Sequence, residues 1–195
     1  MIGYNLLGQL GQLGNQMFQL ASLRGIAANN GYNYCFPIHG NVFKDFLGNN
    51  LRIDIHNPFT LEGVNPLNVQ FIDQDRPVVN EDSYYFNENL FNDCPDWVSL
   101  QGFFQSEKYF LNIEDSIRSM FTFKPSILEP CKEMAETVEN PVSLHIRRGD
   151  YLTNHANHNN LSLDYYAKAL DHFKGRDVII FSDDSSWCKQ QELFK

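Results

Sequence analysis

The sequence lacks the features that mark metal-cluster, disulfide-rich and membrane-spanning proteins. Its four cysteines lie far apart and form no C-x-x-C pair, so neither a zinc cluster nor a dense disulfide framework is expected. No stretch reaches the roughly 18 apolar residues of a membrane-spanning helix. The N-terminus has no basic start followed by an apolar run, so it does not resemble a secretory signal. We therefore expect a soluble, cytoplasmic protein.

The sequence also lacks the positive charge that nucleic-acid binding requires. Its formal net charge is −9, which argues against DNA, RNA or anionic membranes as general partners. No G-x-G-x-x-G motif follows a predicted strand and no G-K-[ST] triplet is present, which disfavours an NAD-dependent oxidoreductase and a P-loop enzyme. A phosphate-bearing ligand would therefore need a local cluster of cations.

The hydrophobic share of 43% is enough for one sizeable core or two small ones. A Gly-rich loop at residues 8–14 leads into a predicted helix with Asn15 as its N-cap and Gly31 as its C-terminal stop. A strand over residues 32–36 is predicted next. Residues 39–95 should be mostly loops, with strands near 67–72 and 84–86. A strand over 97–104 and helices over 106–121 and 128–138 follow.

From Pro141 the pattern becomes a regular alternation of strands and helices. Strands are predicted over residues 142–147 and 178–182, and helices over 162–173 and 185–194. This order is typical of parallel strands joined by right-handed crossovers, as in Rossmann-like domains, whose ligands bind at the carboxyl ends of the strands. Two strands are few for a buried parallel sheet. The domain is therefore expected to be a fragment, or to receive strands from the N-terminal half or from another chain.

The strongest chemical signal is the run from His145 to Asp150, HIRRGD, at the end of a predicted strand. Arg147 and Arg148 could bind a diphosphate through paired, charge-assisted hydrogen bonds. The alternative is a surface charge pair with Asp150.

Two weaker signals accompany it. Asp183 and Asp184 end the next strand, where they could accept hydrogen bonds from a ribose or a guanine, or cap the helix that begins at Ser185. The loop from Gly11 to Gln16 could let backbone approach a ligand closely, or could simply form a tight turn. His155 and His158 lie in an Asn-rich run that is typical of a solvated loop, so no metal site is expected there.

Four motifs occur in one order along the chain: GQLGNQMFQLA, GFFQSEKYF, HIRRGDYL and FSDDSSWC. Together, and with LSLDYYAKAL as a fifth match, the chain resembles glycosyltransferase family eleven, the α-1,2-fucosyltransferases. The resemblance covers nearly the whole chain. It implies an α/β fold of the GT-B type with two Rossmann-like lobes: an acceptor-side domain over residues 1–138 and a partial donor domain over residues 139–195.

The resemblance implies a reaction as well. Such an enzyme moves L-fucose from GDP-fucose to the 2-hydroxyl of a terminal galactoside, with inversion and without a metal or another cofactor. The implied partners are therefore GDP-fucose and a galactose-terminated glycan. The implied location is the cytoplasm or the periphery of a membrane where glycans are assembled.

The resemblance also assigns roles by position. Arg147 would contact the diphosphate and stabilise the departing GDP, while Arg148 supports the loop. Asn15 would reach the donor from the opposite domain. The remaining donor-site residues that it implies, including those for the guanosine, are His145, Asp150, Asp183, Asp184 and Gly14. No residue stands out as the general base.

The chain departs from the family pattern at its C-terminus. Members continue into a Ser-, Phe- and Trp-rich donor segment, commonly of the type ANSSFSWW, and this chain does not contain it. The donor lobe is therefore expected to be incomplete. This leaves open an alternative of another class: an inactive nucleotide- or glycan-binding remnant, or a subunit completed by a partner chain or by a second copy in a homo-oligomer.

Overall fold

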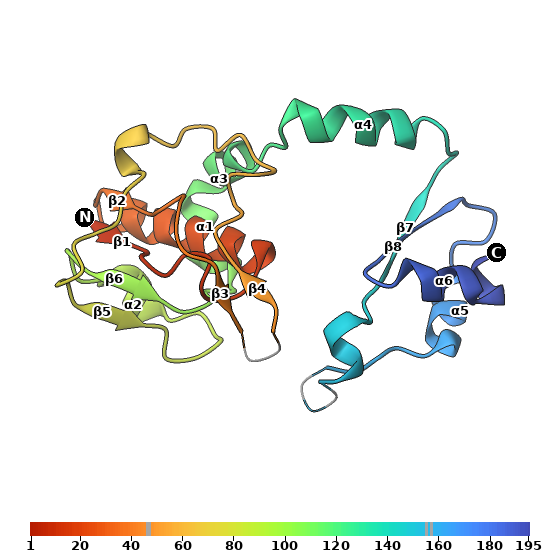
Figure 1. Ribbon diagram of the computed structural model, residues 1–195. Coiled ribbons are helices and arrows are strands. Elements are labelled where there is room, and N and C mark those ends of the chain that lie inside the picture. The colour runs from red at the N-terminus through yellow and green to blue at the C-terminus, as the bar shows by residue number, and fades with distance from the viewer. Residues whose placement is uncertain (46–47, 155, 157) are drawn as a thin grey trace. The chain divides into compact units, whose positions relative to one another are not determined.

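The computed structural model describes residues 1–45, 48–154, 156 and 158–195 (Figure 1), so His155 lies outside the described residues. The chain forms two compact units, Met1–Ile127 and Leu128–Lys195, each with its own parallel sheet. The predicted α/β class is confirmed. The two units divide within helix α4 (Pro125–Ala135), earlier than the predicted boundary after residue 138. The acceptor and donor roles of the two halves stay predictions.

The N-terminal unit is built on a four-stranded sheet in the order β2-β1-β6-β5. All neighbouring strands in this sheet are parallel. The strands are short: β1 covers Ile2–Gly3, β2 Tyr34–Cys35, β5 Val78–Asn80 and β6 Ser99–Gln101. Helix α1 (Leu13–Asn29) crosses from β1 to β2, as expected for a parallel pair. The unit also contains the antiparallel hairpin of β3 (Phe43–Lys44) and β4 (Asn50–Leu51) and the short helices α2 (Glu88–Asn92) and α3 (Glu114–Met120).

A single apolar core holds this unit together. Tyr4, Phe104 and Tyr109 are fully buried, and their rings meet edge to face, with centroids 6.2 Å apart for Tyr4 and Phe104 and 5.4 Å apart for Phe104 and Tyr109. Gly25 of α1 lies against this cluster, where an added Cβ would stand 1.9 Å from the Tyr109 carbonyl oxygen. The helix therefore needs a glycine there to lie close to the backbone of Tyr109 and Phe110.

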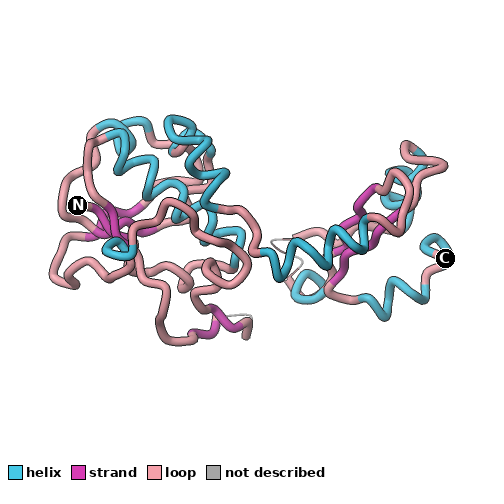
Figure 2. Tube along the Cα trace, turned by 90° about the horizontal axis from the view of Figure 1, so that it is seen from above, coloured by secondary structure: helices cyan, strands magenta, loops and turns pink. Residues whose placement is uncertain are grey.

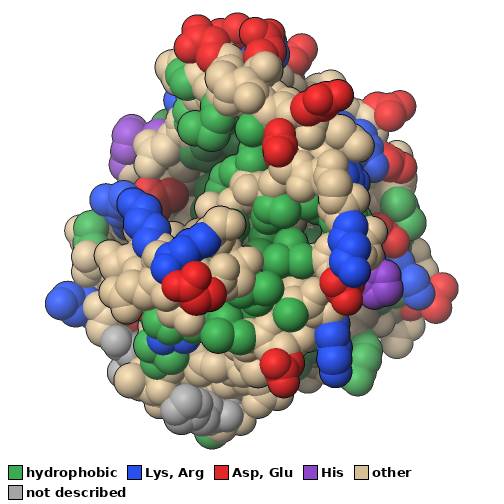
Figure 3. All heavy atoms as spheres, turned by 90° about the vertical axis from the view of Figure 1, so that its right-hand side faces the viewer, with side chains coloured by type: hydrophobic (Ala, Val, Ile, Leu, Met, Phe, Trp, Pro, Cys, Tyr) green, Lys and Arg blue, Asp and Glu red, His purple; other side chains and the backbone are tan. Residues whose placement is uncertain are grey.

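The C-terminal unit is smaller and pairs strand β7 (Val142–Ile146) in parallel with β8 (Val178–Ser182). Helix α5 (Leu163–Asp171) connects the two strands, and α6 (Ser185–Gln190) follows β8 (Figure 2). Ile146, Tyr166 and Cys188 form its buried core. Large apolar side chains such as Val178 and Phe181 remain exposed on the sheet. Figure 3 shows that apolar side chains are exposed on the face that it displays.

The predicted ends of the first helix are partly correct. The helix begins at Leu13 with Gln12 at the N-cap position, so the prediction of Asn15 as the N-cap is wrong. Gln12 makes no side-chain hydrogen bond to the helix, and the turn of the loop at Gly11, with φ +85°, sets the start instead. Gly31, with φ +68°, follows the C-cap residue Asn30, so the predicted stop is confirmed.

Residues 39–110 differ most from the predictions. The strand over 67–72 is wrong: Asn65 accepts a hydrogen bond from the Leu67 N–H, and the segment Pro66–Asn68 forms a 3₁₀ turn. The strand over 84–86 is also absent, whereas β5 was not predicted. The strand over 97–104 shortens to β6, because Trp97 and Phe104 both have positive φ values.

The predicted helices are also shorter or divided. The helix over 106–121 breaks at Phe110, where φ is −139°, into two 3₁₀ turns, Glu107–Tyr109 and Leu111–Ile113, followed by α3. The helix over 128–138 corresponds to α4, which starts at its first proline and continues through Pro130. The helix over 185–194 ends at Gln190, and a 3₁₀ turn, Glu192–Phe194, follows it. None of the helices in the described ranges has the length and apolar content needed to cross a membrane.

Candidate functional site

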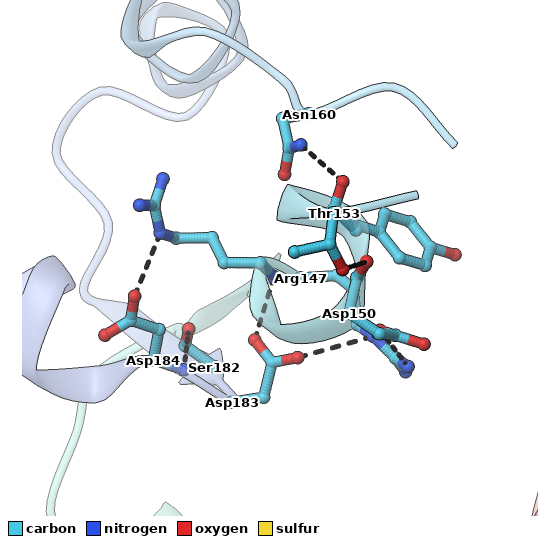
Figure 4. A network of polar contacts seen from close by, with 9 residues as sticks. Arg147, Asp150, Thr153, Asn160, Ser182, Asp183 and Asp184 are labelled. Atoms are coloured by element: carbon cyan, nitrogen blue, oxygen red, sulfur yellow. Dashed lines mark hydrogen bonds and ion pairs between the residues drawn. The ribbon is translucent and has the colours of Figure 1, made fainter. Parts of the chain in front are cut away.

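The register of β7 and β8 brings the two polar motifs of the C-terminal unit together. Ile146 pairs with Ser182, so the residues that follow each strand emerge side by side at the carboxyl edge of the sheet (Figure 4). Arg147 and Arg148 leave β7 at this edge, and Asp183 and Asp184 leave β8 opposite them. The structure therefore confirms that these motifs meet at one edge.

Arg147 is held by two carboxylates and one ring. Its Nη2 and Nε lie 2.8 Å and 3.2 Å from Asp150 Oδ1, and its Nε lies 3.3 Å from Asp183 Oδ2. The guanidinium carbon lies 5.1 Å from the centroid of the Tyr151 ring, which stacks in turn on His158 at 4.1 Å. The hydrogen bond to Asp150 raises the pKa of Arg147 above its ordinary value. The side chain stays 38% exposed, so a ligand can still reach this cation.

Arg148 is more enclosed and supports the loop. Its side chain is 20% exposed, its Nε lies 3.0 Å from Asp184 Oδ2, and its guanidinium carbon lies 3.8 Å above the Trp187 ring. Its backbone N–H donates to Asp183 Oδ1 at 2.8 Å. These contacts join the end of β7 to the start of α6, while the role of Arg148 in a donor site stays a prediction.

Asp184 caps helix α6. Its Oδ1 accepts a hydrogen bond from the Trp187 N–H at 3.0 Å, and its other oxygen pairs with Arg148. The hydrogen bonds from Trp187 and Arg148 lower the pKa of Asp184 below its ordinary value. The helix-capping alternative drawn from the sequence is therefore confirmed for this carboxylate, while contact with a guanosine stays a prediction.

Gly149 lets Asp183 lie against the loop. An added Cβ at Gly149 would stand 2.6 Å from Asp183 Oδ2, closer than such contacts normally allow. A side chain here would push Asp183 away from both arginines. Packing against Asp183 thus explains why the HIRRGD motif has a glycine at position 149, without reference to a ligand.

The other predicted site residues lie elsewhere. His145 is an exposed residue of β7, in register with Phe181, and among the described residues it is not joined to the arginine network. Asn15 and Gly14 belong to the N-terminal unit, where Asn15 Oδ1 accepts a hydrogen bond from Gln105 Nε2 at 2.6 Å. Nothing lies within 4 Å of the position of an added Cβ at Gly14, so that surface is open.

Two buried glutamines of α1, whose roles the sequence analysis did not assign, hold neighbouring loops: Gln16 the loop after β4 and Gln19 the Gly-rich loop. Gln16 is fully buried: its Nε2 donates to the Arg52 carbonyl at 2.8 Å, and its Oε1 accepts from the N–H groups of Asp54 and Ile55. Gln19 Nε2 donates to the Leu10 carbonyl at 2.8 Å. The available signal was a set of polar residues, Gln16 and Gln19 with Ser22 and Arg24, on the buried side of the helix.

The described residues contain no group of three or more His, Cys, Asp or Glu side chains arranged to hold a metal ion. Whether the reaction uses a metal therefore stays a prediction of the family resemblance.

Parallel α/β units with arginines at a strand end fit a glycosyltransferase, and comparison with known proteins identifies the family. Residues 2–193 match the description "Glycosyl transferase family 11", so the chain belongs to this family, as its motifs predict.

Two relatives from Escherichia coli are similar to the chain. An alpha-1,2-colitosyltransferase is 28% identical over 94% of this chain and 71% of the relative. The O-antigen biosynthesis glycosyltransferase WbnK is 35% identical over 54% of this chain and 39% of the relative. The chain thus spans only part of the length of each of these proteins. No solved structure matches it.

Proposed function

We propose that the chain forms part of an inverting enzyme that moves L-fucose from GDP-fucose to the 2-hydroxyl of a terminal galactoside. Its membership of glycosyl transferase family 11 supports sugar transfer. The observation that carries the donor assignment is the pair of arginines at the carboxyl end of β7, one part-exposed and one enclosed. In this proposal the two units are the lobes of a GT-B enzyme, with the donor bound mainly by the C-terminal unit.

The reaction needs a cation beside the diphosphate. As GDP departs, negative charge develops on the β-phosphate, and a preorganised guanidinium can stabilise it where no metal does so. One nitrogen of Arg147 is available to a ligand. Its Nη1 makes no hydrogen bond within the described residues, while Nε and Nη2 bind Asp150. In the proposal, the diphosphate binds Nη1 and replaces the longer contact to Asp183.

The remaining donor contacts are proposed from the family resemblance. His145, Asp183 and Asp184 recognise the guanosine. Asp150 orients the guanidinium of Arg147. Asp150 suits this role because its Oδ1 accepts from two nitrogens of that guanidinium. The family resemblance also implies a donor contact for Asn15, and the surface beside it at Gly14 is open within its own unit.

A second donor sugar is favoured by one comparison. The relative that aligns with 94% of this chain is named for colitose transfer. We therefore propose that the chain be assayed with GDP-fucose and GDP-colitose in parallel, with a β-galactoside as acceptor and GDP-mannose as the negative control. A new α-1,2 linkage with either of the first two donors identifies the sugar. Transfer from neither, without GDP binding, contradicts the proposal.

A second candidate function is a binding protein without turnover, because the buried core that the described residues form in the C-terminal unit is small: Ile146, Tyr166 and Cys188, with partly buried neighbours. Calorimetric titration with GDP separates the two functions: micromolar binding without sugar transfer indicates the binding protein. Size-exclusion chromatography shows whether a second copy is associated with the chain.

A further inference from the structure

Tyr151 directly follows the HIRRGD run and contacts the part-exposed cation of that motif. It belongs to the 3₁₀ turn Gly149–Leu152, which leads away from the end of β7. Its side chain is partly buried, and the guanidinium carbon of Arg147 lies 5.1 Å from the centroid of its ring. A cation over an aromatic face is attracted by the π electrons of the ring. The ring therefore gives Arg147 a contact of another kind in addition to its carboxylate partners.

The Tyr151 ring is itself held by residues from further along the chain. The imidazole of His158 stacks on it, with centroids 4.1 Å apart and an angle of 4° between the two planes. Asn160 Nδ2 donates to the Tyr151 carbonyl at 2.8 Å (Figure 4). The backbone of the turn is fixed as well, since the Leu152 N–H donates to the Arg148 carbonyl at 3.0 Å. Both the side chain and the backbone of Tyr151 are thus restrained.

The two carboxylates leave the guanidinium of Arg147 a second way to bind. Asp150 Oδ1 accepts from Nε and Nη2, and Asp183 Oδ2 lies 3.3 Å from Nε. A guanidinium can also offer a carboxylate its other edge, Nη1 with Nη2. Without the ring, Arg147 can turn that edge to Asp183 and so use Nη1 in an internal ion pair. The ring opposes this turn, because the turn would move the cation off the aromatic face.

We propose that Tyr151 is a positioning residue for Arg147, with His158 as the support of its ring. The ring keeps Nη1 available to a ligand, which in the proposed function is the diphosphate of the donor. The inference rests on the proposed function for the identity of that ligand, but not for the contact between ring and guanidinium. Tyr151 acts through Arg147 and not by contact with the donor, so its hydroxyl group is dispensable.

Calorimetric titration of the whole chain with GDP and with guanosine tests this role. Tyr151→Leu is expected to weaken GDP binding about two- to fivefold, the effect of losing a cation–π contact at a partly exposed site. Guanosine, which has no phosphate, should bind this variant and the parent chain equally. Tyr151→Phe keeps the ring and should bind GDP as the parent does. Tyr165→Leu is the matched control and should also bind GDP normally, because this ring is 52% exposed and contacts Tyr166 instead.

NMR of the arginine side chains gives a second readout that needs no ligand. The Nε–H signal of Arg147, identified by its loss in Arg147→Lys, is sensitive to the ring current of a nearby aromatic side chain. The signal should move in Tyr151→Leu and stay in place in Tyr151→Phe and Tyr165→Leu. His158→Ala should move the signal and weaken GDP binding in the same direction as Tyr151→Leu, but less. His158→Phe, which keeps a ring for the stack, should restore both.

Weaker GDP binding by Tyr151→Leu, with guanosine binding unchanged and Tyr151→Phe unaffected, supports the positioning role. Unchanged GDP binding, an equal loss for GDP and guanosine, or an Nε–H signal that is the same in Tyr151→Leu and the parent overturns it. The proposed function fails separately, when the parent chain neither binds GDP nor transfers sugar. In that case the Nε–H signals of the variants alone decide whether Tyr151 positions Arg147.

Discussion

The carboxylate of Asp183 is hydrogen-bonded to the backbone of Arg148, with its Oδ1 2.8 Å from that N–H. Its other oxygen lies 3.3 Å from Nε of Arg147. One side chain at the end of β8 thus orders both arginines at the end of β7. This arrangement depends on the glycine at position 149, where any Cβ would displace the carboxylate.

Arg148 is expected to contribute more to stability than to ligand binding. Arg148→Ala removes the pair with Asp184 and the stacking on Trp187, so the free energy of unfolding should fall by about 1 to 2 kcal/mol. Arg148→Lys should recover only part of this loss, since an ammonium group cannot reproduce the planar stacking. Urea unfolding measures both. A variant as stable as the parent protein would show that these contacts are not formed.

Asp184 is expected to give the C-terminal unit a pH-dependent stability. Its pKa in the folded chain lies below the ordinary value of 3.8, so its ionised form stabilises the fold above that value. The contribution is lost as the pH falls through the folded-state pKa. Asp184→Asn keeps a capping oxygen but not the charge, and should be less stable than the parent at pH 7. The unfolding free energies of the two proteins should converge as the pH falls below the ordinary carboxyl pKa of 3.8. A constant gap at every pH would refute this.

Gly11, in the N-terminal loop, and Gly14, in the first turn of α1, should respond differently to alanine. Gly11 has φ +85° and an added Cβ would stand 1.9 Å from Asn15 Nδ2, so Gly11→Ala should cost about 1 to 2 kcal/mol or more. Gly14 lies in the first turn of α1 with open space, so Gly14→Ala should leave the melting temperature unchanged or slightly raised. If Gly14 borders the donor, the second variant should still weaken GDP-fucose binding.

Gln16 should be important for the loop that follows β4. Gln16→Ala leaves one carbonyl and two N–H groups without their partner, and should lower the free energy of unfolding by about 2 kcal/mol or more. Gln12→Ala is the control, because Gln12 is exposed and its side chain does not cap the helix. Thermal unfolding of the two variants compares them directly, and similar melting temperatures would contradict the assigned role.

The C-terminal unit could be predicted from the sequence because its signals are local. The apolar run of β8 gives the strand its observed limits, Val178–Ser182, and Ser162 caps α5 at the predicted place. The N-terminal unit could not be predicted as well, since β1 and β5 are two or three residues long and depend on pairing with neighbouring strands, β1 with β2 and β6, and β5 with β6. Such strands leave almost no periodic pattern.

In the candidate site, too, local features could be predicted from the sequence and contacts between distant segments could not. That Arg147 and Asp183 lie at one sheet edge follows from two parallel strands, and the sequence predicts it. That they pair with each other depends on the register of β7 and β8, which spacing alone does not give. The stacking of His158 on Tyr151 could not be predicted either, because the spacing of two residues along a loop does not give the direction of their rings.

Calorimetric titration of GDP into the parent chain and into Arg147→Ala tests the central claim most directly. Because Arg147 is the exposed member of the pair, its loss should weaken GDP binding at least about tenfold, the cost of one charge-assisted contact to a phosphate. Arg148→Ala should weaken it less. Equal, negligible effects of the two substitutions would show that Arg147 belongs to an internal ion pair and does not bind the donor.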